Sequence, residues 1–275
     1  MIKKLENLKE QNRLTKPLIH CITNPISIHD CANMILAVGA RPIMAEHPEE
    51  VEEITEVSSA LMLNLGNITD ARIISMQRAL STANRKNIPV LLDLVGVTCS
   101  QLRRSFAKQL LSQGVFSVIK GNISEILAAA ELPYHGTGID AGSQDAVSVE
   151  NQAWYCETAR HLAKHLNCTV MATGKKDLIA DAENAFLVSN GHAALSGVTG
   201  TGCMVGALTA AYLPGSKTIF TKSGIFETSS IIPDKTKVSY GTAAALLAAV
   251  AMGISGELAA EISKGPGSFQ TALLD

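Results

Sequence analysis

Short apolar runs alternate along the chain with longer segments in which apolar residues recur every three or four positions. Brief runs rich in Val, Ile and Leu, bounded by glycine, proline or polar residues, are typical of buried strands. The pattern predicts strands at residues 17–23, 42–45, 60–65, 89–95, 117–120, 168–173, 177–180 and 185–188.

The segments with helical periodicity lie between these runs. They predict helices at residues 1–10, 28–38, 70–86, 101–112, 147–166, 202–213 and 239–263, with a further helix opening at 48. Alternation of helices with almost wholly apolar strands predicts an α/β fold with a mostly parallel sheet covered by helices on both faces. The last three strands, joined only by polar turns, favour a meander at one edge of the sheet.

The remaining segments predict a loop and leave one region open. Residues 133–142 are rich in glycine and are expected to form the loop, while the pattern assigns no element to 214–237. The sequence contains no internal repeat and no composition typical of a linker. We therefore expect a single domain over residues 1–275.

Composition excludes several classes of protein. Apolar residues make up 47% and charged residues 17%, which excludes disordered and fibrous chains. The net charge of −2, without a basic stripe, argues against nucleic acid as a partner. The longest apolar run, 243–254, is too short to span a bilayer, so no membrane association is expected. The six cysteines lack metal or disulfide spacing and are expected to be free thiols in a cytoplasmic protein, with Cys21 and Cys31 in the core.

The most distinctive motif is the glycine turn Val198-Thr199-Gly200-Thr201-Gly202-Cys203, which leads directly into a helical pattern. Its glycines let the backbone turn tightly and approach a ligand closely. The free N–H groups and the dipole of the following helix favour an anion there. A plain turn before a helix remains an alternative. Cys203 stands at the helix start, where the pKa of a thiol is expected to fall, although a buried packing role is commoner for cysteine.

A second motif, Lys120-Gly121-Asn122-Ile123-Ser124-Glu125, follows a predicted strand, at the edge where open α/β sheets bind ligands. Asn122 and Glu125 are three residues apart and share one face of a first helical turn. Their oxygens suit a hydrated Mg²⁺, but the same spacing suits a helix cap, which this motif alone favours. Asp93 ends another apolar strand, where it is expected either to join the metal shell or to cap a loop.

Taken in chain order, these and further motifs resemble the hydroxyethylthiazole kinase family of the ribokinase-like superfamily. The matching segments are His20-Cys21-Ile22-Thr23-Asn24, Asp30-Cys31-Ala32-Asn33, Pro42-Ile43-Met44-Ala45, Asn64-Leu65-Gly66, Gly121-Asn122-x-x-Glu125, Gly138-Ile139-Asp140, Met171-Ala172-Thr173-Gly174, residues 198–203 and Gly265-Pro266-Gly267-Ser268-Phe269. The ordered series covers about residues 15–270 and is far more specific than any single member. A cysteine closing the glycine turn is the most informative feature, because most ribokinase-like enzymes have an aspartate there.

The resemblance implies a ribokinase-like fold and phosphorylation of the primary alcohol of 4-methyl-5-(2-hydroxyethyl)thiazole by ATP and Mg²⁺. It also implies a homotrimer with substrate sites between subunits. The implied thiazole contacts are Met44 and Gly200, with Asn24 and Gly66 nearby. The implied phosphate contacts are Lys120 and Thr173, and the implied Mg²⁺ shell is Asp93, Asn122 and Glu125. Gly200, Thr201 and Gly202 would form the anion hole, and Cys203 would be the base.

Three departures from the family pattern keep alternatives open. The family usually has arginine in place of Lys120, so a bidentate phosphate contact becomes a point charge. It has Asp-Pro-Val-Gly where this chain has Asp93-Leu94-Val95-Gly96, and the segment 214–237 matches poorly. The alternatives are a kinase of another small alcohol, such as a hydroxymethylpyrimidine, and a non-catalytic nucleotide-binding paralogue.

Overall fold

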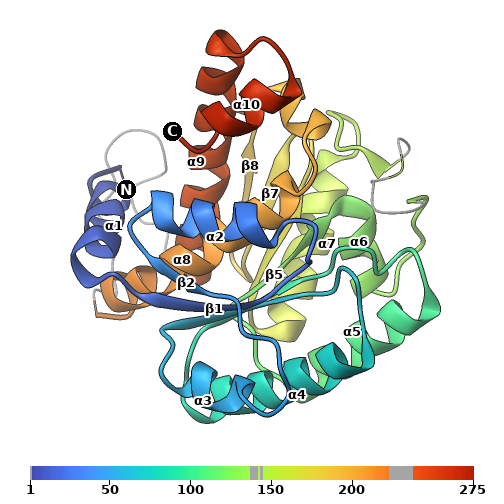
Figure 1. The fold of residues 1–275 in the computed structure, drawn as a ribbon. Helices are drawn as coiled ribbons and strands as arrows, with labels where there is room; N and C mark the ends of the chain where they lie inside the picture. The colour runs from blue at the N-terminus through green and yellow to red at the C-terminus, as the bar shows by residue number, and fades with distance from the viewer. Residues whose placement is uncertain (1, 137–141, 143–144, 223–237) are drawn as a thin grey trace.

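The computed structural model describes residues 2–136, 142, 145–222 and 238–275, and is built around one eight-stranded sheet (Figure 1). The strands are β1 Leu18–Ile22, β2 Arg41–Ile43, β3 Ala60–Asn64, β4 Val90–Asp93, β5 Val118–Asn122, β6 Thr169–Thr173, β7 Asp177–Ala180 and β8 Ala185–Val188. Their order across the sheet is β2-β1-β3-β4-β5-β6-β7-β8. The first six pair in parallel, and β7 and β8 pair antiparallel at one edge. The expected α/β class, the mostly parallel sheet and the edge meander are confirmed.

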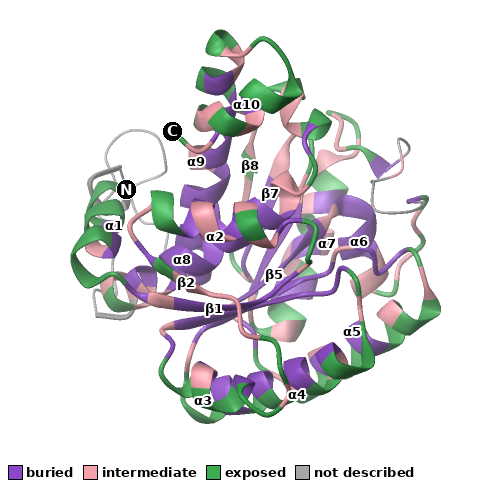
Figure 2. Cartoon of the chain, viewed as in Figure 1, coloured by how far each residue is buried: buried purple, intermediate pink, exposed green. Residues whose placement is uncertain are grey.

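Helices cover both faces of the sheet. One layer consists of α1 Ile2–Thr15, α2 Ile28–Ala37, α8 Thr201–Lys222, α9 Tyr240–Ile262 and α10 Pro266–Ala272. The other consists of α3 Val51–Glu56, α4 Asp70–Arg85, α5 Gln101–Gln113, α6 Ile123–Ala129 and α7 Gln152–Leu166. Each layer packs its own apolar cluster against the sheet, and Figure 2 shows the sheet as the most continuously buried part of the molecule. A short 3₁₀ helix, Ala193–Gly197, precedes the glycine turn.

The longest disagreement with the sequence pattern is the end of α8. The pattern ends this helix at residue 213, before Pro214, but the helix continues to Lys222. Proline in a helix interior removes one hydrogen bond and crowds the preceding turn. Here Leu213 and Ser216, on either side of it, are fully buried, so tertiary packing holds the helix through the proline. The rest of the unassigned segment, 223–237, and the motif at 138–140 lie outside the described residues.

Helix α9 is the most apolar element of the chain. Its 23 residues are long and apolar enough to cross a membrane, so the 12-residue run 243–254 underestimated the length of the apolar helix. However, 61% of the most apolar window is buried inside the protein, as expected for the core helix of a globular domain. All six cysteines are free, and Cys21 and Cys31 lie in the core as predicted.

Candidate active site

The site begins with a row of polar side chains at the ends of three neighbouring strands. Met62, Leu91 and Val118 are in register across β3, β4 and β5 and belong to the apolar cluster under α8 and α9. Alternate residues of a strand face the same side. Two residues further along each strand, the same register aligns Asn64, Asp93 and Lys120. The strands therefore carry a polar row at their carboxyl-terminal ends, on the face that α8 covers.

Asp93 and Lys120 form an ion pair in this row. The Lys120 ammonium lies 3.1 and 3.3 Å from the two oxygens of Asp93, and only 4% and 0% of the two side chains is exposed. Burial lowers the pKa of Lys120, but the negative charge of Asp93 and of other neighbours outweighs burial and raises it. Lys120 is therefore a firmly held cation, and Asp93 is a buried carboxylate with a charged partner.

Asn122 and Glu125 form a reciprocal cap at the start of α6. The Asn122 side chain accepts from the Glu125 N–H at 2.9 Å, and Glu125 Oε2 accepts from the Asn122 N–H at 2.7 Å. Glu125 Oε1 accepts from the N–H of Gly96, in the loop after Asp93, at 2.7 Å. Burial, helped by the charge of Asp93, raises the pKa of Glu125 to about 7. The helix-cap interpretation is confirmed, and Glu125 also links this cap to the loop that follows Asp93.

The N-terminus of α8, unlike that of α6, has no side-chain cap from any residue that the structure describes. Gly200 precedes it with φ +87°, and a Cβ there would lie 2.7 Å from the Cβ of Ser27. Among the described residues, no side chain accepts from the N–H groups of residues 201–203. A Cβ on Gly202 would lie 3.3 Å from Lys120 Nζ, so the ammonium adjoins this open helix start. Unpaired N–H groups, the helix dipole and one cation together suit a phosphate group.

Cys203 lies in the first turn of this helix and is buried. Its Sγ accepts a hydrogen bond from Asn64 Nδ2 at 3.3 Å. Burial raises the pKa of the thiol, Asp93 adds to that rise, and Lys120 opposes it. The sequence-based expectation of a lowered pKa is therefore wrong. A position at a helix start does favour the thiolate, but the surrounding protein removes the water that would solvate it.

The residues expected at the substrate fall into two groups. Asn24 and Gly66 are in contact, since a Cβ on Gly66 would lie 2.6 Å from Asn24 Nδ2. The turn that begins at Asn24 includes Ser27, which touches Gly200. Asn24, Gly66 and Gly200 thus line one region. Met44 follows β2, is partly buried against the α8–α9 cluster, and is separated from β3 by β1 in the sheet order.

Thr173 ends β6 beside Asn122, and its hydroxyl donates to the Gly121 carbonyl at 3.2 Å. Sequence reasoning did not assign a role to two residues of the site, Asn64 and Gly96. Asn64 appeared only within the matching segment Asn64-Leu65-Gly66, without a role of its own. The two acceptors of its amide nitrogen, Asp93 and Cys203, are 29 and 139 residues away in sequence, so no local pattern could reveal them.

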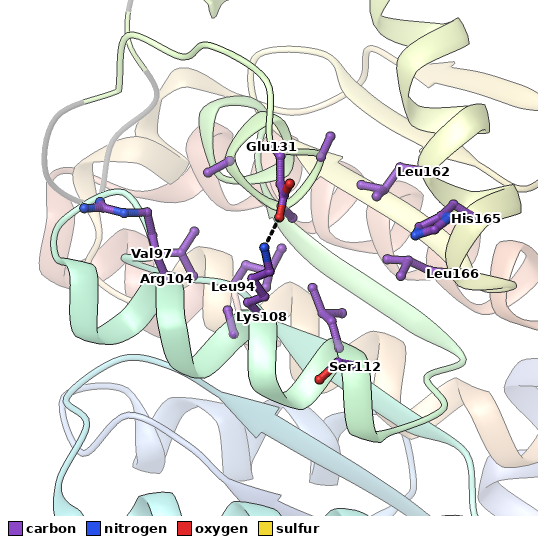
Figure 3. A pocket seen from close by; sticks show the side chains of 14 residues that line it. Leu94, Val97, Arg104, Lys108, Ser112, Glu131, Leu162, His165 and Leu166 are labelled. Carbon is purple, nitrogen blue, oxygen red and sulfur yellow. Dashed lines mark hydrogen bonds and ion pairs between the residues drawn. The ribbon is translucent and has the colours of Figure 1, made fainter.

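A cavity of about 480 Å³ lies elsewhere, between α5, α6 and α7 (Figure 3). Its walls are mainly apolar, with the exposed ion pair Lys108–Glu131 at its side. None of the residues expected at the site lines it. The buried charged groups, rather than this cavity, mark the candidate active site.

Comparisons with known proteins show which family and which fold the chain has. Residues 8–230 match the family model described as the hydroxyethylthiazole kinase family. The chain is 44% identical to hydroxyethylthiazole kinase 2 of Clostridium botulinum strain 657, covering 98% of this chain and 92% of the relative. The solved hydroxyethylthiazole kinase structure from Pyrococcus horikoshii OT3 has a TM-score of 0.81 and 32% identity, covering 100% of this chain and 92% of the other. A ribokinase-like protein from Enterococcus faecalis, at 11% identity and a TM-score of 0.58, covers 98% of this chain and 92% of the other and shares the fold.

Proposed function

Because the chain belongs to the hydroxyethylthiazole kinase family, we propose that it transfers a phosphoryl group from ATP to the primary alcohol of 4-methyl-5-(2-hydroxyethyl)thiazole. One observation carries the proposal from the structure. The uncapped start of α8 adjoins a buried thiol, a buried carboxylate and a buried ammonium within one hydrogen-bonded group. Phosphoryl transfer needs mainly positioning and charge stabilisation, and this arrangement supplies both.

The phosphoryl group would lie against the N–H groups of residues 200–202. Gly200 leaves those donors uncovered, because glycine has no side chain to turn back and cap the helix. Lys120 would add a positive charge beside Gly202, and Thr173 would contact the phosphates from the neighbouring strand. Lys120 also pairs with Asp93. Nucleotide binding therefore requires the ammonium to share its charge between a carboxylate and phosphates.

The carboxylates suit a hydrated metal ion. Each oxygen of Asp93 and Glu125 already accepts from a protein N–H or ammonium group. A carboxylate oxygen can accept a second hydrogen bond, and Mg²⁺ keeps most of its waters. Asp93, Asn122 and Glu125 would hold Mg²⁺ through those waters. When bound, the ion would neutralise charge on the phosphates. The described residues contain no separate cluster of three or more His, Cys, Asp or Glu suited to a metal.

Cys203 would accept the proton of the substrate alcohol as its oxygen bonds to phosphorus and the bond to ADP breaks. Only the thiolate can accept that proton. Since burial and Asp93 raise the thiol pKa, the thiolate is the minor form near neutral pH. The rate should therefore increase with pH through the neutral range. The alcohol would approach from the region of Asn24 and Gly66, with Met44 contributing from the sheet edge.

We also expect the protein to be a cytoplasmic homotrimer that binds neither nucleic acid nor membranes. Support for assembly comes from the outer half of α9, where Ile254, Leu258 and Ile262 follow one another at four-residue intervals and are 46%, 58% and 73% exposed. An exposed apolar stripe of this kind favours association between copies. A monomer mass in solution would contradict the assembly but leave the chemistry untouched.

The proposal is tested by measuring ADP release with the thiazole alcohol, with a hydroxymethylpyrimidine and without any alcohol. We expect turnover with the thiazole alcohol to exceed the other two rates by at least ~10²-fold. Cys203→Ala should lose ~10²-fold or more in kcat, the contribution typical of a general base, while Cys203→Asp should remain active because its carboxylate is ionised at pH 7. Cys168→Ala, just before β6, is the matched control and should keep its activity.

Equal rates with both alcohols would contradict the substrate assignment. A parent protein that binds nucleotide but releases no ADP would favour the non-catalytic alternative. If Cys203→Ala turned over like the parent, Cys203 would be a packing residue and the proton would leave through water.

A further inference from the structure

Asn64 connects three parts of the site through one side chain. Its Oδ1 accepts from the N–H of Gly66 at 2.9 Å. Its Nδ2 donates to Asp93 Oδ2 at 3.2 Å and to Cys203 Sγ at 3.3 Å. The side chain is fully buried at the last residue of β3. No other described side chain hydrogen-bonds to both the thiol and the carboxylate.

The orientation of this amide follows from its partners. A backbone N–H can only donate, so the atom facing Gly66 must be the oxygen. The amide nitrogen has two protons, and two acceptors surround it, namely Asp93 and Cys203. Every hydrogen-bonding group of the amide except one oxygen lone pair is thus used. The side chain cannot turn over without breaking all three interactions.

This arrangement fixes the thiol as well as the asparagine. A donor 3.3 Å from Sγ directs one sulfur lone pair toward β3 and holds the thiol in one rotamer. The same amide holds Gly66, which contacts Asn24 in the region expected to receive the alcohol. The acceptor of the alcohol proton and the backbone beside the alcohol are therefore tied to one rigid strand end.

We propose that Asn64 is a positioning residue of the phosphoryl transfer, which aligns the Cys203 thiol with Asp93 and with the Gly66 backbone where the alcohol binds. This inference rests on the proposed function. Asn64 acts through Cys203. It takes no part itself in the bond between the alcohol oxygen and phosphorus. A misplacement of about 1 Å can reduce a rate by about 10²-fold, so loss of this alignment should lower kcat far more than the affinity for the alcohol.

The alternative is a purely structural asparagine that closes the turn at Gly66. Asn64→Asp separates the two roles, because aspartate keeps the shape and the oxygen facing Gly66 but loses both N–H donors. Asn64→Ala removes the whole amide without adding charge beside Asp93. Asn12→Ala is the matched control: Asn12 is also fully buried, but it donates to the Ala211 carbonyl in α8, away from the site.

The experiment measures kcat and KM for the thiazole alcohol in each variant, in both the parent and the Cys203→Ala background. We expect Asn64→Asp and Asn64→Ala to lower kcat by about 10- to 100-fold while KM for the alcohol changes less than about 3-fold. In the Cys203→Ala background, the same substitutions should cost less than about 2-fold, because residues that act as a unit are not additive. Asn12→Ala should lower the melting temperature but leave kcat within about 2-fold of the parent.

Two results would overturn the inference. One is a kcat within about 2-fold of the parent in both Asn64 variants, with folding confirmed by circular dichroism. The other is a full multiplication of the Asn64 and Cys203 losses in the double variants. Neither result would touch the proposed function, which fails only if the parent protein does not phosphorylate the thiazole alcohol.

Discussion

Helices α6 and α8 both begin beside the carboxyl-terminal ends of the strands, but their first turns are finished in opposite ways. At α6, Asn122 and Glu125 exchange hydrogen bonds with each other's backbone. At α8, the preceding residue is Gly200, and no described side chain caps the N–H groups of residues 201–203. A closed helix start stabilises the fold, whereas an open one has free donors for a ligand. The same edge of the sheet therefore contains a capped helix start and the uncapped one at which we propose that an anion binds.

The difference depends on where the charges lie. Glu125 is engaged at both oxygens, one by the α6 cap and one by Gly96. Lys120, two residues before Asn122 on β5, instead lies near Gly202 at the uncapped start of α8. The negative group thus supports the closed helix start, and the positive group faces the open one. This separation brings a cation, rather than the Glu125 carboxylate, next to the proposed phosphate position.

We expect the largest effect from a side chain added at Gly200, the residue before the uncapped start of α8. Gly200→Ala forces an L-residue into φ +87° and a Cβ into the Ser27 side chain, so the turn must shift. Because the N–H donors would move with it, we expect kcat/KM to fall by about 10³-fold. We also expect a loss of about 1–3 kcal/mol in the free energy of unfolding. Steady-state kinetics and chemical denaturation measure the two quantities.

Gly265→Ala provides the matched control for that change. Gly265 also precedes a helix, α10, but its φ is −178° and a Cβ there would meet nothing within 4 Å. We expect its kinetics and stability to remain close to those of the parent. Normal turnover in Gly200→Ala would mean that the start of α8 is an ordinary turn.

The next effect concerns the cation at the open start. Lys120→Ala leaves Asp93 buried without a charged partner, and we expect it to cost about 3 kcal/mol of stability and to raise KM for ATP by about 10-fold. Lys120→Arg keeps the charge and should retain or improve ATP binding, since a guanidinium can contact phosphate through two N–H groups. Titration of the melting temperature with nucleotide gives an independent measure of affinity.

Lys108→Ala tests whether burial matters. Lys108 also pairs with an acid, Glu131, but 76% and 70% of these side chains is exposed. Surface pairs contribute little, so this variant should behave like the parent in both assays. An ATP KM in Lys120→Ala equal to that of the parent would remove Lys120 from the phosphate site.

The capped N-terminus of α6 could be predicted from the sequence, and the uncapped N-terminus of α8 only in part. A capping box needs residues three positions apart, so Asn122 and Glu125 show it directly. The glycine turn at 198–203 was also evident, and with it the expected anion site. The mostly parallel sheet and the helices on both of its faces were predicted from apolar runs and periodicity, because burial on both faces leaves a clear pattern. The order of the strands in the sheet was not.

The interactions between distant segments could not be predicted in the same way. The raised pKa of Cys203 depends on burial and on Asp93, which is 110 positions earlier in the chain. The pairing of Lys120 with Asp93 depends on strand register, which the sequence pattern leaves undefined. At Pro214 the local pattern was clear but the prediction was wrong. Proline predicts a helix end, but packing on both sides of it keeps α8 helical to Lys222.

The smallest effect concerns the charge inside the closed start, measured without metal or nucleotide. The folded-state pKa of Glu125, about 7, lies above its unfolded value near 4.5, mainly because of burial. Between these values the folded protein binds more protons than the unfolded chain. The stability that protonated Glu125 contributes is therefore complete below pH ~4.5 and declines until the pH passes ~7. At about 1.4 kcal/mol per pH unit the full decline is about 3.5 kcal/mol, of which roughly 3 kcal/mol falls between pH 4.5 and 8.

Glu125→Gln cannot lose a proton and should lack this decline. It keeps one acceptor oxygen for the two N–H groups of Asn122 and Gly96, so it starts from a somewhat lower stability at pH 5 and approaches or passes the parent by pH 8. Glu131→Gln is the control: this acid just past the other end of α6 is exposed, and Lys108 lowers rather than raises its pKa. Urea denaturation from pH 4.5 to 8 measures the three curves. Parallel curves for the parent and Glu125→Gln would show that folding does not raise the pKa of Glu125. The carboxylate at the start of α6 would then be charged without a loss in the free energy of unfolding.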